Sequence, residues 1–249
     1  NKTYFDLKAK TAKSTASDIA ELANLDPAPK EFLALEQLKY TGTFKGYIQN
    51  FDVNGDLTTA VGSAKVNLHY SMPTNTETTY AGTLQSDQIN LGQLLDNDKL
   101  GNTAFDVVIN GKGLTLHTLS TQLSGKIKLL EYANYGYQNI AIDGEFHENL
   151  FDGMGSIADP NFDLRFNGTL DLTSDQPKID VASNIKRVNL RLLGLDSLDN
   201  YVRFNGDIAL EGNNLDDVTG SVKLDSFELT RRGSSYTVKD LEVTAARDG

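Results

Sequence analysis

Hydrophobic and polar residues alternate almost without error along residues 162–172, and the rest of the chain repeats this design. The apolar residues and Gly168 fall on one parity, and the residues between them, such as Arg165 and Asp171, are polar. Because successive side chains of a β-strand point to opposite faces, the pattern predicts a strand with one apolar and one polar face. A turn is expected at 174–177, and a second alternating strand at 179–190.

The same period of two predicts strands along most of the chain, separated by turn-rich segments. These strands are expected at 4–9, 38–48, 51–59, 64–70, 78–89, 105–111, 114–118, 123–129, 137–146, 150–157, 162–172, 179–190, 202–210, 218–229 and 236–245. Several are longer than usual. We therefore expect an all-β fold, in which one long curved antiparallel sheet forms a U-shaped groove with an apolar interior and a few short helices.

Short helices are expected at three places in this pattern. Residues 15–25 carry Thr15 and Asp18 at capping-box spacing, and 90–96 and 192–198 are expected as helical turns. A short motif, Asp or Asn followed by Ile or Leu and then Leu three positions later, begins at Asp18, Asn90 and Asn189. It suggests sub-repeats starting near these residues within one continuous segment, 1–249.

Nine of the 21 glycines lie between two apolar residues in an apolar-x-Gly-x-apolar pattern, against about three expected for random placement. On the apolar parity of a strand, glycine removes bulk and permits a bend. Asn-Gly and Asp-Gly pairs also form hairpin turns, but the alternation keeps its phase through each pair, which favours strand interiors. We assign sheet curvature to Gly42, Gly144, Gly168, Gly206 and Gly220.

The net charge, the lack of cysteine and the lack of a long apolar run disfavour several classes of function. The net charge of −11, with the charges scattered, disfavours binding to nucleic acid and to anionic membrane surfaces. With no cysteine, the chain has no disulfide, thiolate nucleophile or thiolate zinc site. No run of about 18 apolar residues, as a membrane helix needs, is present. The chain begins without Met and ends within a predicted strand, so we expect a segment of a longer protein.

No catalytic or metal-binding constellation emerges. His69, His117 and His147 lack paired-ligand spacing and are expected on the surface or in cross-strand pairs. Asp52, Asn54 and Asp56 start like a calcium loop, but the glycine is misplaced and the twelfth position is Ser63. We expect no enzyme activity and no cofactor.

A sheet with one apolar face must bury that face against something. If the sheet closes or stacks on itself, the face forms an ordinary core. If it stays open, it presents an elongated apolar surface for a ligand or partner. The alternation leaves both alternatives open, and an outer-membrane barrel is disfavoured because the chain lacks Trp and paired aromatic girdles.

Residues 151–172 and 179–195 resemble the TamB/AsmA-like envelope proteins, in particular the long TamB-like proteins of Bacteroidetes-type bacteria. The resemblance is carried by the Gly-x-Ile-x-Asp-Pro-Asn turn at 155–161, the Phe-x-Gly-x-Leu strand at 166–170 and the Asn-Leu-x-x-Leu turn at 189–193. The family has no catalytic signature.

The resemblance implies a periplasmic bridge that moves phospholipid, or another acyl-chain ligand, along an apolar groove between the inner and outer membranes. It also implies an inner-membrane anchor and a BamA-like outer-membrane partner, both contacted through regions outside this chain. A scaffold for assembly of outer-membrane proteins, and a closed β-sandwich or solenoid, are the alternatives. The residues expected to line the groove are Ile140, Ile142, Phe146, Phe162, Leu164, Phe166, Leu170, Leu172, Ile179, Val181, Phe204, Ile208, Leu210, Val222 and Leu224.

Overall fold

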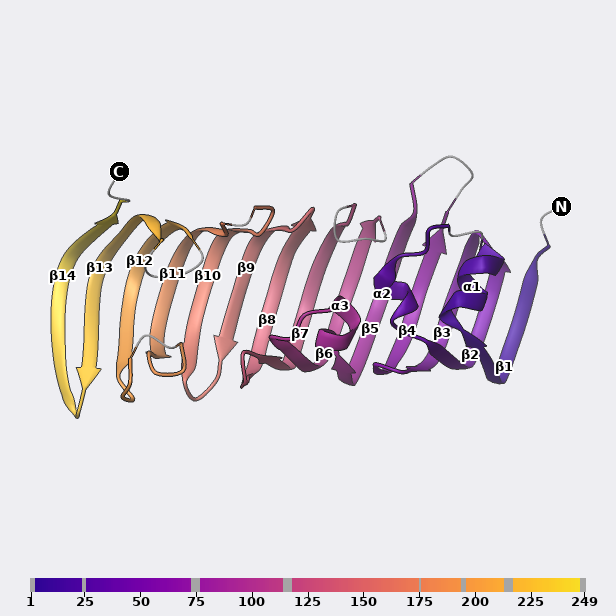
Figure 1. The fold of residues 1–249 in the computed structure, drawn as a ribbon, viewed down its shortest axis with the longest axis horizontal. Coiled ribbons are helices and arrows are strands. Elements are labelled where there is room, and N and C mark those ends of the chain that lie inside the picture. Colours follow the sequence, from indigo (N-terminus) through magenta and orange to yellow (C-terminus); the bar gives the residue numbers. More distant parts are fainter. Residues whose placement is uncertain are drawn as a thin grey trace. The chain divides into compact units, whose positions relative to one another are not determined.

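The protein is all-β. The computed structural model describes residues 3–23, 26–72, 77–113, 118–174, 176–193, 196–212 and 217–246. Its fourteen strands follow one another as an antiparallel meander, in which the strand order is the sequence order (Figure 1). The strands are β1 (Phe5–Thr15), β2 (Gln37–Tyr47), β3 (Asn50–Thr59), β4 (Gly62–Ser71), β5 (Thr79–Asn90), β6 (Leu100–Lys112), β7 (Ser120–Tyr132), β8 (Tyr135–His147), β9 (Leu150–Ala158), β10 (Phe162–Asp171), β11 (Lys178–Asn189), β12 (Tyr201–Glu211), β13 (Thr219–Arg231) and β14 (Ser234–Ala245).

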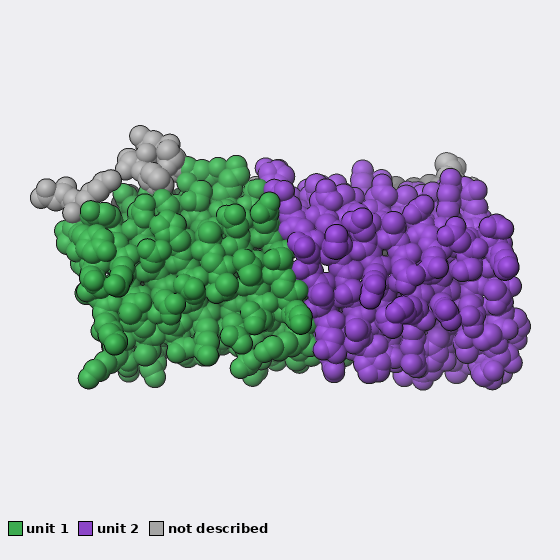
Figure 2. Space-filling model, turned by 180° about the vertical axis from the view of Figure 1, so that it is seen from behind, with its two compact units in different colours: residues 1–136 green, residues 137–249 purple. Residues whose placement is uncertain are grey.

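The chain divides into two compact units, residues 1–136 and 137–249, coloured separately in Figure 2. Unit 1 contains β1–β7 and the helices α1 (Ala16–Ala23), α2 (Lys30–Leu33) and α3 (Leu91–Leu95). Unit 2 contains β9–β14 and all but the first two residues of β8, and its described residues include no helix. The single continuous segment expected from the sequence stays a prediction.

The strand predictions are confirmed with small shifts at the ends. The largest extension is in β1, which continues beyond the predicted 4–9 to Thr15. There the register shifts between Ala9 and Ala12, and this irregularity breaks the alternation on which the prediction rested. The strand expected at 114–118 falls mostly outside the described residues.

The capping box at the start of α1 is confirmed. The Asp18 backbone N–H donates to Thr15 Oγ1 at 3.1 Å, and the Thr15 N–H donates to an Asp18 carboxylate oxygen at 3.3 Å. The helical turn expected at 90–96 is α3, whose N-cap is Asn90. Helix α2 was not anticipated, because its four residues follow Pro29 and are too few to show a period. The turn expected at 192–198 lies partly outside the described residues.

The Asn-Gly and Asp-Gly pairs lie inside strands, as predicted. Other residues form the hairpin turns. Glu148 and Asn149 join β8 to β9 with φ of 47° and 70°, and Arg232 and Gly233 join β13 to β14 with φ of 49° and 80°. Two successive positive φ values are typical of the type I′ turn, whose twist matches that of the flanking strands.

The fourteen-stranded sheet is one layer thick over most of its area. The chain exposes 15345 Å², whereas a compact protein of 27.2 kDa would expose about 11,000 Å². In most strands the apolar parity is half-buried and the polar parity exposed. Neighbouring side chains of the same sheet therefore provide most of the burial. The buried hydrophobic residues include Ala16, Ala20, Val61, Ala104, Val107, Phe151, Phe162, Val181, Val188, Val202 and Leu224.

Candidate apolar ligand-binding face

The strand register of unit 2 aligns the predicted lining residues in rows across one face, which we call the apolar wall of unit 2. Each row takes one residue from each of seven strands, β8 to β14. The four rows are Ile140, Ile157, Leu164, Ile185, Phe204, Phe227 and Val238; Ile142, Gly155, Phe166, Ser183, Gly206, Leu224 and Leu241; Gly144, Gly153, Gly168, Val181, Ile208, Val222 and Val243; and Phe146, Phe151, Leu170, Ile179, Leu210, Gly220 and Ala245.

Two predicted lining residues fall outside these four rows. Phe162 lies one row beyond, opposite Val188, and is 2% exposed, so it belongs to the core rather than to an accessible surface. Its ring packs against Tyr137, with the centroids 4.9 Å apart. Leu172 follows the last residue of β10 and is 55% exposed.

Most of the wall is accessible from solvent. Val181 and Leu224 are buried, Ile179 is exposed, and the remaining predicted residues of the four rows are half-buried. No second layer covers them among the described residues. The wall is therefore an open apolar surface.

Glycines shape this wall in two ways. Gly168 has a φ of +147°, and a Cβ there would overlap the Asp180 carbonyl oxygen of the neighbouring strand. This backbone conformation essentially requires glycine. At Gly144 no such φ occurs, but a Cβ would still meet the Asp152 carbonyl oxygen at 2.5 Å and the Phe151 ring at 2.7 Å. Both glycines thus allow close approach of a neighbouring backbone, and Gly144 also provides space for an aromatic ring. The curvature that we assigned to Gly42, Gly144, Gly168, Gly206 and Gly220 stays a prediction.

The opposite face of unit 2 is polar and carries a shallow depression around Met154. Arg165, Asn167 and Ala182 line it, and Met154 is 56% exposed. On the same face, the Asn184 amide donates to Asn205 Oδ1 at 2.5 Å. The lining also includes Ile142 and Phe166 from the apolar rows, and the depression is open, so a ligand on the apolar wall would lie along an open surface rather than inside a cavity.

Unit 1 has its own apolar wall. One row contains Leu7, Phe44, Val53, Leu68, Gly82, Ile109 and Leu123, and the next contains Phe5, Gly46, Phe51, Tyr70, Tyr80, Gly111 and Thr121. The Phe51 ring lies 4.7 Å from that of Phe44 and 4.9 Å from that of Tyr70. Burial raises the pKa of the Tyr70 and Tyr80 phenols, and the Tyr80 hydroxyl bonds to that of Thr121 at 2.7 Å. These two rows carry five aromatic residues, as many as the four rows of unit 2.

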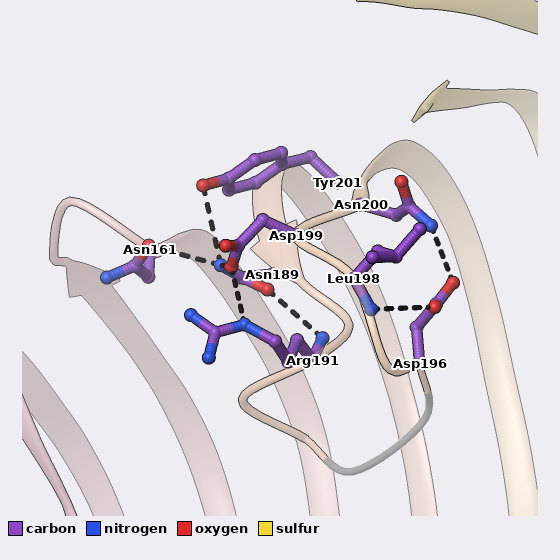
Figure 3. A network of polar contacts seen from close by, with 8 residues as sticks. All are labelled: Asn161, Asn189, Arg191, Asp196, Leu198, Asp199, Asn200 and Tyr201. Carbon is purple, nitrogen blue, oxygen red and sulfur yellow. Dashed lines mark hydrogen bonds and ion pairs between the residues drawn. The ribbon is translucent and has the colours of Figure 1, made fainter. Parts of the chain in front are cut away.

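A polar network closes one strand end of unit 2 (Figure 3). The buried Asn189 side chain donates to Asp199 Oδ1 at 2.9 Å, and its Oδ1 accepts from the Arg191 backbone N–H at 3.0 Å. Longer contacts of 3.4 Å reach Asn161 and Tyr201. The sequence motif marked Asn189, but no local signal shows that Asp199 would meet it.

Charge strengthens this network. Hydrogen bonds from Asn189 and then from Arg191 lower the pKa of Asp199, and the Arg191 Nε–H lies 2.8 Å from its carboxylate. The Leu198 backbone N–H and then the Asn200 amide lower the pKa of Asp196. In Figure 3 the Asn200 nitrogen faces Asp196 and its oxygen points away. This oxygen is buried without a hydrogen-bond partner in the described part of the chain.

The described histidines lie beside carboxylates rather than in a group of metal ligands. His69 pairs with Asp52 across two strands at 2.8 Å, as expected of a cross-strand residue, and His147 lies 3.8 Å from Glu148. His117 lies outside the described residues. Within the described ranges, no three His, Asp or Glu side chains gather as metal ligands, and no helix has the length and apolar character needed to cross a membrane.

Comparison with known proteins gives no match: no protein-family model, curated protein or solved structure is significantly similar to the chain.

Proposed function

We propose that the apolar walls carry the acyl chains of phospholipid between the inner and outer membranes, in the periplasm of a Gram-negative bacterium of the Bacteroidetes type. In this proposal the chain is a non-enzymatic segment of a longer TamB/AsmA-like bridge, and a BamA-like outer-membrane protein is contacted by regions outside it. The proposed sheet bends into a U-shaped groove around the lipid, with the bends at its glycines.

The open, half-exposed wall of unit 2 is the observation that carries this proposal. Apolar side chains, interrupted by glycines and by Ser183, recur in each row across the seven strands, and large contiguous apolar surfaces mark binding sites for apolar ligands or partners. The polar face behind the wall keeps the sheet compatible with water. A lipid would place its acyl chain on residues such as Leu164, Leu170 and Phe204, with its head group in water.

The same surface suits transport better than storage. Each buried CH₂ contributes about 0.8 kcal/mol, so a chain of many methylenes is held. An acyl chain on an open wall of similar side chains would gain nearly the same energy at successive positions. It could therefore slide without meeting a deep trap.

In-cell photo-crosslinking tests the proposal directly. A photoreactive residue at Leu170 or Phe204, both on the wall, is expected to capture phospholipid. The control is Arg165, which lies on the polar face. Equal lipid capture at Leu170 and Arg165, or protein capture alone at Leu170, would contradict the proposal.

A matched pair of substitutions tests which face matters. Leu170→Asp introduces a charge on the wall, whereas Asp171→Leu changes the adjacent residue on the opposite face. We expect Leu170→Asp to impair lipid transfer between vesicles more than Asp171→Leu does. Native mass spectrometry of the wild-type chain is expected to show bound lipid, and the Leu170→Asp variant less of it.

A scaffold for outer-membrane proteins is the second proposal, in which polypeptide binds the outer strands β1 and β14, each of which pairs with one strand only among the described residues. Extended polypeptide binds such edges by main-chain hydrogen bonds. Crosslinks from β14 to nascent outer-membrane strands, without lipid capture at Leu170, would support the scaffold over lipid transport.

A further inference from the structure

Four basic side chains gather on the polar face of unit 2, although the whole chain has a net charge of −11. They are Arg165 in β10, Lys186 and Arg187 in β11, and Arg203 in β12, and all four are exposed. We call these four residues the basic cluster. They lie on three neighbouring strands in the middle of unit 2.

A β-bulge brings these side chains together. The register of β11 against β12 shifts after Ile185, so that Lys186 and Arg187 both lie opposite Arg203. Arg165 is diagonal to Lys186, because it pairs with the residue two positions before it. Directly opposed Cβ atoms lie about 5 Å apart and diagonal ones about 7–8 Å apart. The four long side chains can therefore reach one ligand.

None of the four forms an ion pair with a carboxylate within the described ranges of the chain. Two lysines elsewhere on the polar face of unit 2 do so: Lys178 lies 3.5 Å from Glu211, and Lys223 lies 3.5 Å from Glu242. The cations of the cluster are thus accessible to an external anion.

Two carboxylates lie beside the cluster in the strand register. Asp163 is the β10 partner of Arg187, and Glu228 is the β13 partner of Arg203. Four cations against two carboxylates leave a net charge of +2. The cluster therefore attracts an anion even when these neighbours are counted.

An aromatic ring, rather than a carboxylate, holds the Arg187 guanidinium. Its central carbon, Cζ, lies 4.5 Å from the centre of the Tyr201 ring, a contact that stabilises a cation. The Tyr201 hydroxyl lies 3.4 Å from the amide of the buried Asn189 (Figure 3), so the ring is itself tied to the polar network. A guanidinium stacked in this way keeps N–H donors for a ligand.

We propose that the basic cluster binds the phosphate group of a small, soluble organic phosphate. A phosphate monoester carries a charge of about −1.5 to −2 at pH 7, which matches the charge of the cluster. Its oxygen atoms suit the paired N–H donors of the three guanidinium groups. A carboxylate carries only one negative charge and would leave part of the cluster unneutralised.

The depression around Met154 adjoins the cluster and provides a place for the organic part of the ligand. Arg165 lines it together with Met154, Ala141 and Ala182. The last three side chains are apolar, and Met154 is 56% exposed. Apolar surface beside a few polar groups is typical of small-molecule sites.

The surroundings of the cluster favour a small ligand over a membrane. Exposed aspartates occupy the same face of the neighbouring strand positions, at Asp143, Asp152, Asp180 and Asp207. An anionic membrane would present many charges to these carboxylates and be repelled, whereas a single phosphate ester meets only the cluster. The proposal does not depend on lipid transport, because the apolar wall lies on the opposite face.

NMR titration with phenyl phosphate tests the site. We expect saturable shifts of the side-chain Nε–H signals of Arg165, Arg187 and Arg203. Benzoate has the same ring with a carboxylate in place of the phosphate, and it is expected to bind about tenfold more weakly or worse. Equal binding of benzoate, or the absence of saturable shifts with phenyl phosphate, would overturn the proposal.

A matched pair of variants separates the cluster from net charge. Arg187→Gln/Arg203→Gln is expected to weaken binding of phenyl phosphate about tenfold or more. Lys178→Gln/Lys223→Gln removes the same charge from the same face and is expected to bind like the wild type, because both lysines already pair with glutamates. An equal loss in both variants would contradict the proposal.

A milder variant keeps the test valid if the double arginine variant does not fold. Lys186 is exposed, so Lys186→Gln is expected to retain the amide spectrum of the wild type and to bind phenyl phosphate about threefold more weakly. Unchanged binding by this variant would count against the cluster.

Vesicle flotation separates a soluble ligand from a lipid head group. Phosphatidic acid, added to phosphatidylcholine vesicles, is expected to give no gain in binding that depends on the cluster. A gain that Arg187→Gln/Arg203→Gln abolishes would assign the cluster to a membrane and overturn the proposal. Binding to pure phosphatidylcholine reports on the apolar wall instead, and it is expected to be the same in this variant and the wild type.

Discussion

Two strands of unit 1 and one strand of unit 2 end in different polar contacts, although each unit presents an apolar wall. In unit 1, β1 ends at Thr15 and β5 ends at Asn90, and each of these residues caps a helix with its side chain. In unit 2, β11 ends at Asn189, whose side chain binds the backbone of Arg191 and also Asp199, ten residues after Asn189.

The difference shows that the side chain of the last residue of a strand can make two kinds of contact. It can cap a helix that follows directly in the sequence, or it can bind residues from other segments of the chain. Asn90 is only half-buried, and its cap needs nothing beyond α3. Asn189 is 2% exposed and depends on partners from three segments of the chain. The motif that begins at Asp18, Asn90 and Asn189 therefore does not occupy the same structural position each time. Asn90 and Asn189 end strands, whereas Asp18 lies inside α1, three residues after the cap.

The largest expected loss of stability comes from replacing a glycine that both walls contain, one with a positive φ beside a carbonyl oxygen of the next strand. Gly42 in unit 1 has a φ of +158° and Gly168 in unit 2 a φ of +147°, and a Cβ at either would overlap a carbonyl oxygen of the next strand. Gly42→Ala and Gly168→Ala are each expected to destabilise their own unit by about 3 kcal/mol or more. Hydrogen exchange of backbone amides, compared between units, measures this.

Gly144→Ala is the matched control for Gly168→Ala, because both glycines lie in one row of the wall. Its added methyl group also meets a backbone oxygen, that of Asp152, but Gly144 lacks the positive φ of Gly168, so a smaller cost of about 1–2 kcal/mol is expected. Equal costs at 144 and 168 would contradict the distinction between the two glycines.

The strand ends provide the next prediction. Asn189→Ala removes several hydrogen bonds from a buried site and is expected to destabilise unit 2 by about 2–3 kcal/mol. Asn90→Ala removes a single N-cap and is expected to cost unit 1 about 1 kcal/mol. Denaturant unfolding of both variants provides the measurement, and a larger effect at Asn90 would reverse the comparison.

A smaller effect compares the closely packed aromatic rings of the unit 1 wall with the more widely spaced rings Phe204 and Phe227 of the unit 2 wall. Phe51 packs against two rings at 4.7 and 4.9 Å, whereas Phe204 has one neighbour, Phe227, at 6.4 Å. Phe51→Leu is expected to cost about 1 kcal/mol more than Phe204→Leu, because close aromatic pairs contribute beyond their buried area. Thermal unfolding of the two variants, each with Leu at a half-buried wall position, decides this.

The smallest effect concerns pH. Since the folded-state pKa values of Asp196 and Asp199 are lowered below the ordinary 3.8, their contribution to stability is present above about pH 4 and is lost as pH falls through the folded-state values. NMR titration of the Arg191 and Leu198 amides is expected to show the network loosening only in this acidic range. A transition near pH 6 would point to another group.

The alternation of hydrophobic and polar residues was enough to predict most strands. In a one-layer sheet, nearly every strand residue lies on either the apolar or the polar face, so the pattern continues along the whole strand. It also identified Gly168 and Gly206 as strand residues, since the phase continues through them. Type I′ turns such as Glu148-Asn149 were not anticipated, because these residues need a positive φ that the strand pairing imposes.

Contacts between segments that are distant in the sequence also could not be predicted. The hydrogen bonds of Asn189 to Asp199 and Asn161 depend on where three segments of the chain meet, and the alternation of hydrophobic and polar residues carries no information about that. Similarly, the alternation placed Phe162 on the apolar parity but did not show that Tyr137 and its neighbours bury it fully.

The sequential strand order has a mechanical consequence. Each strand is held by the strands beside it in the sequence, so tension applied to the two chain ends loads the hydrogen bonds of one outer strand at a time. Force would therefore lengthen the molecule in steps rather than in one rupture. Release of β14, with its 12 residues, would add about 40 Å of extended chain.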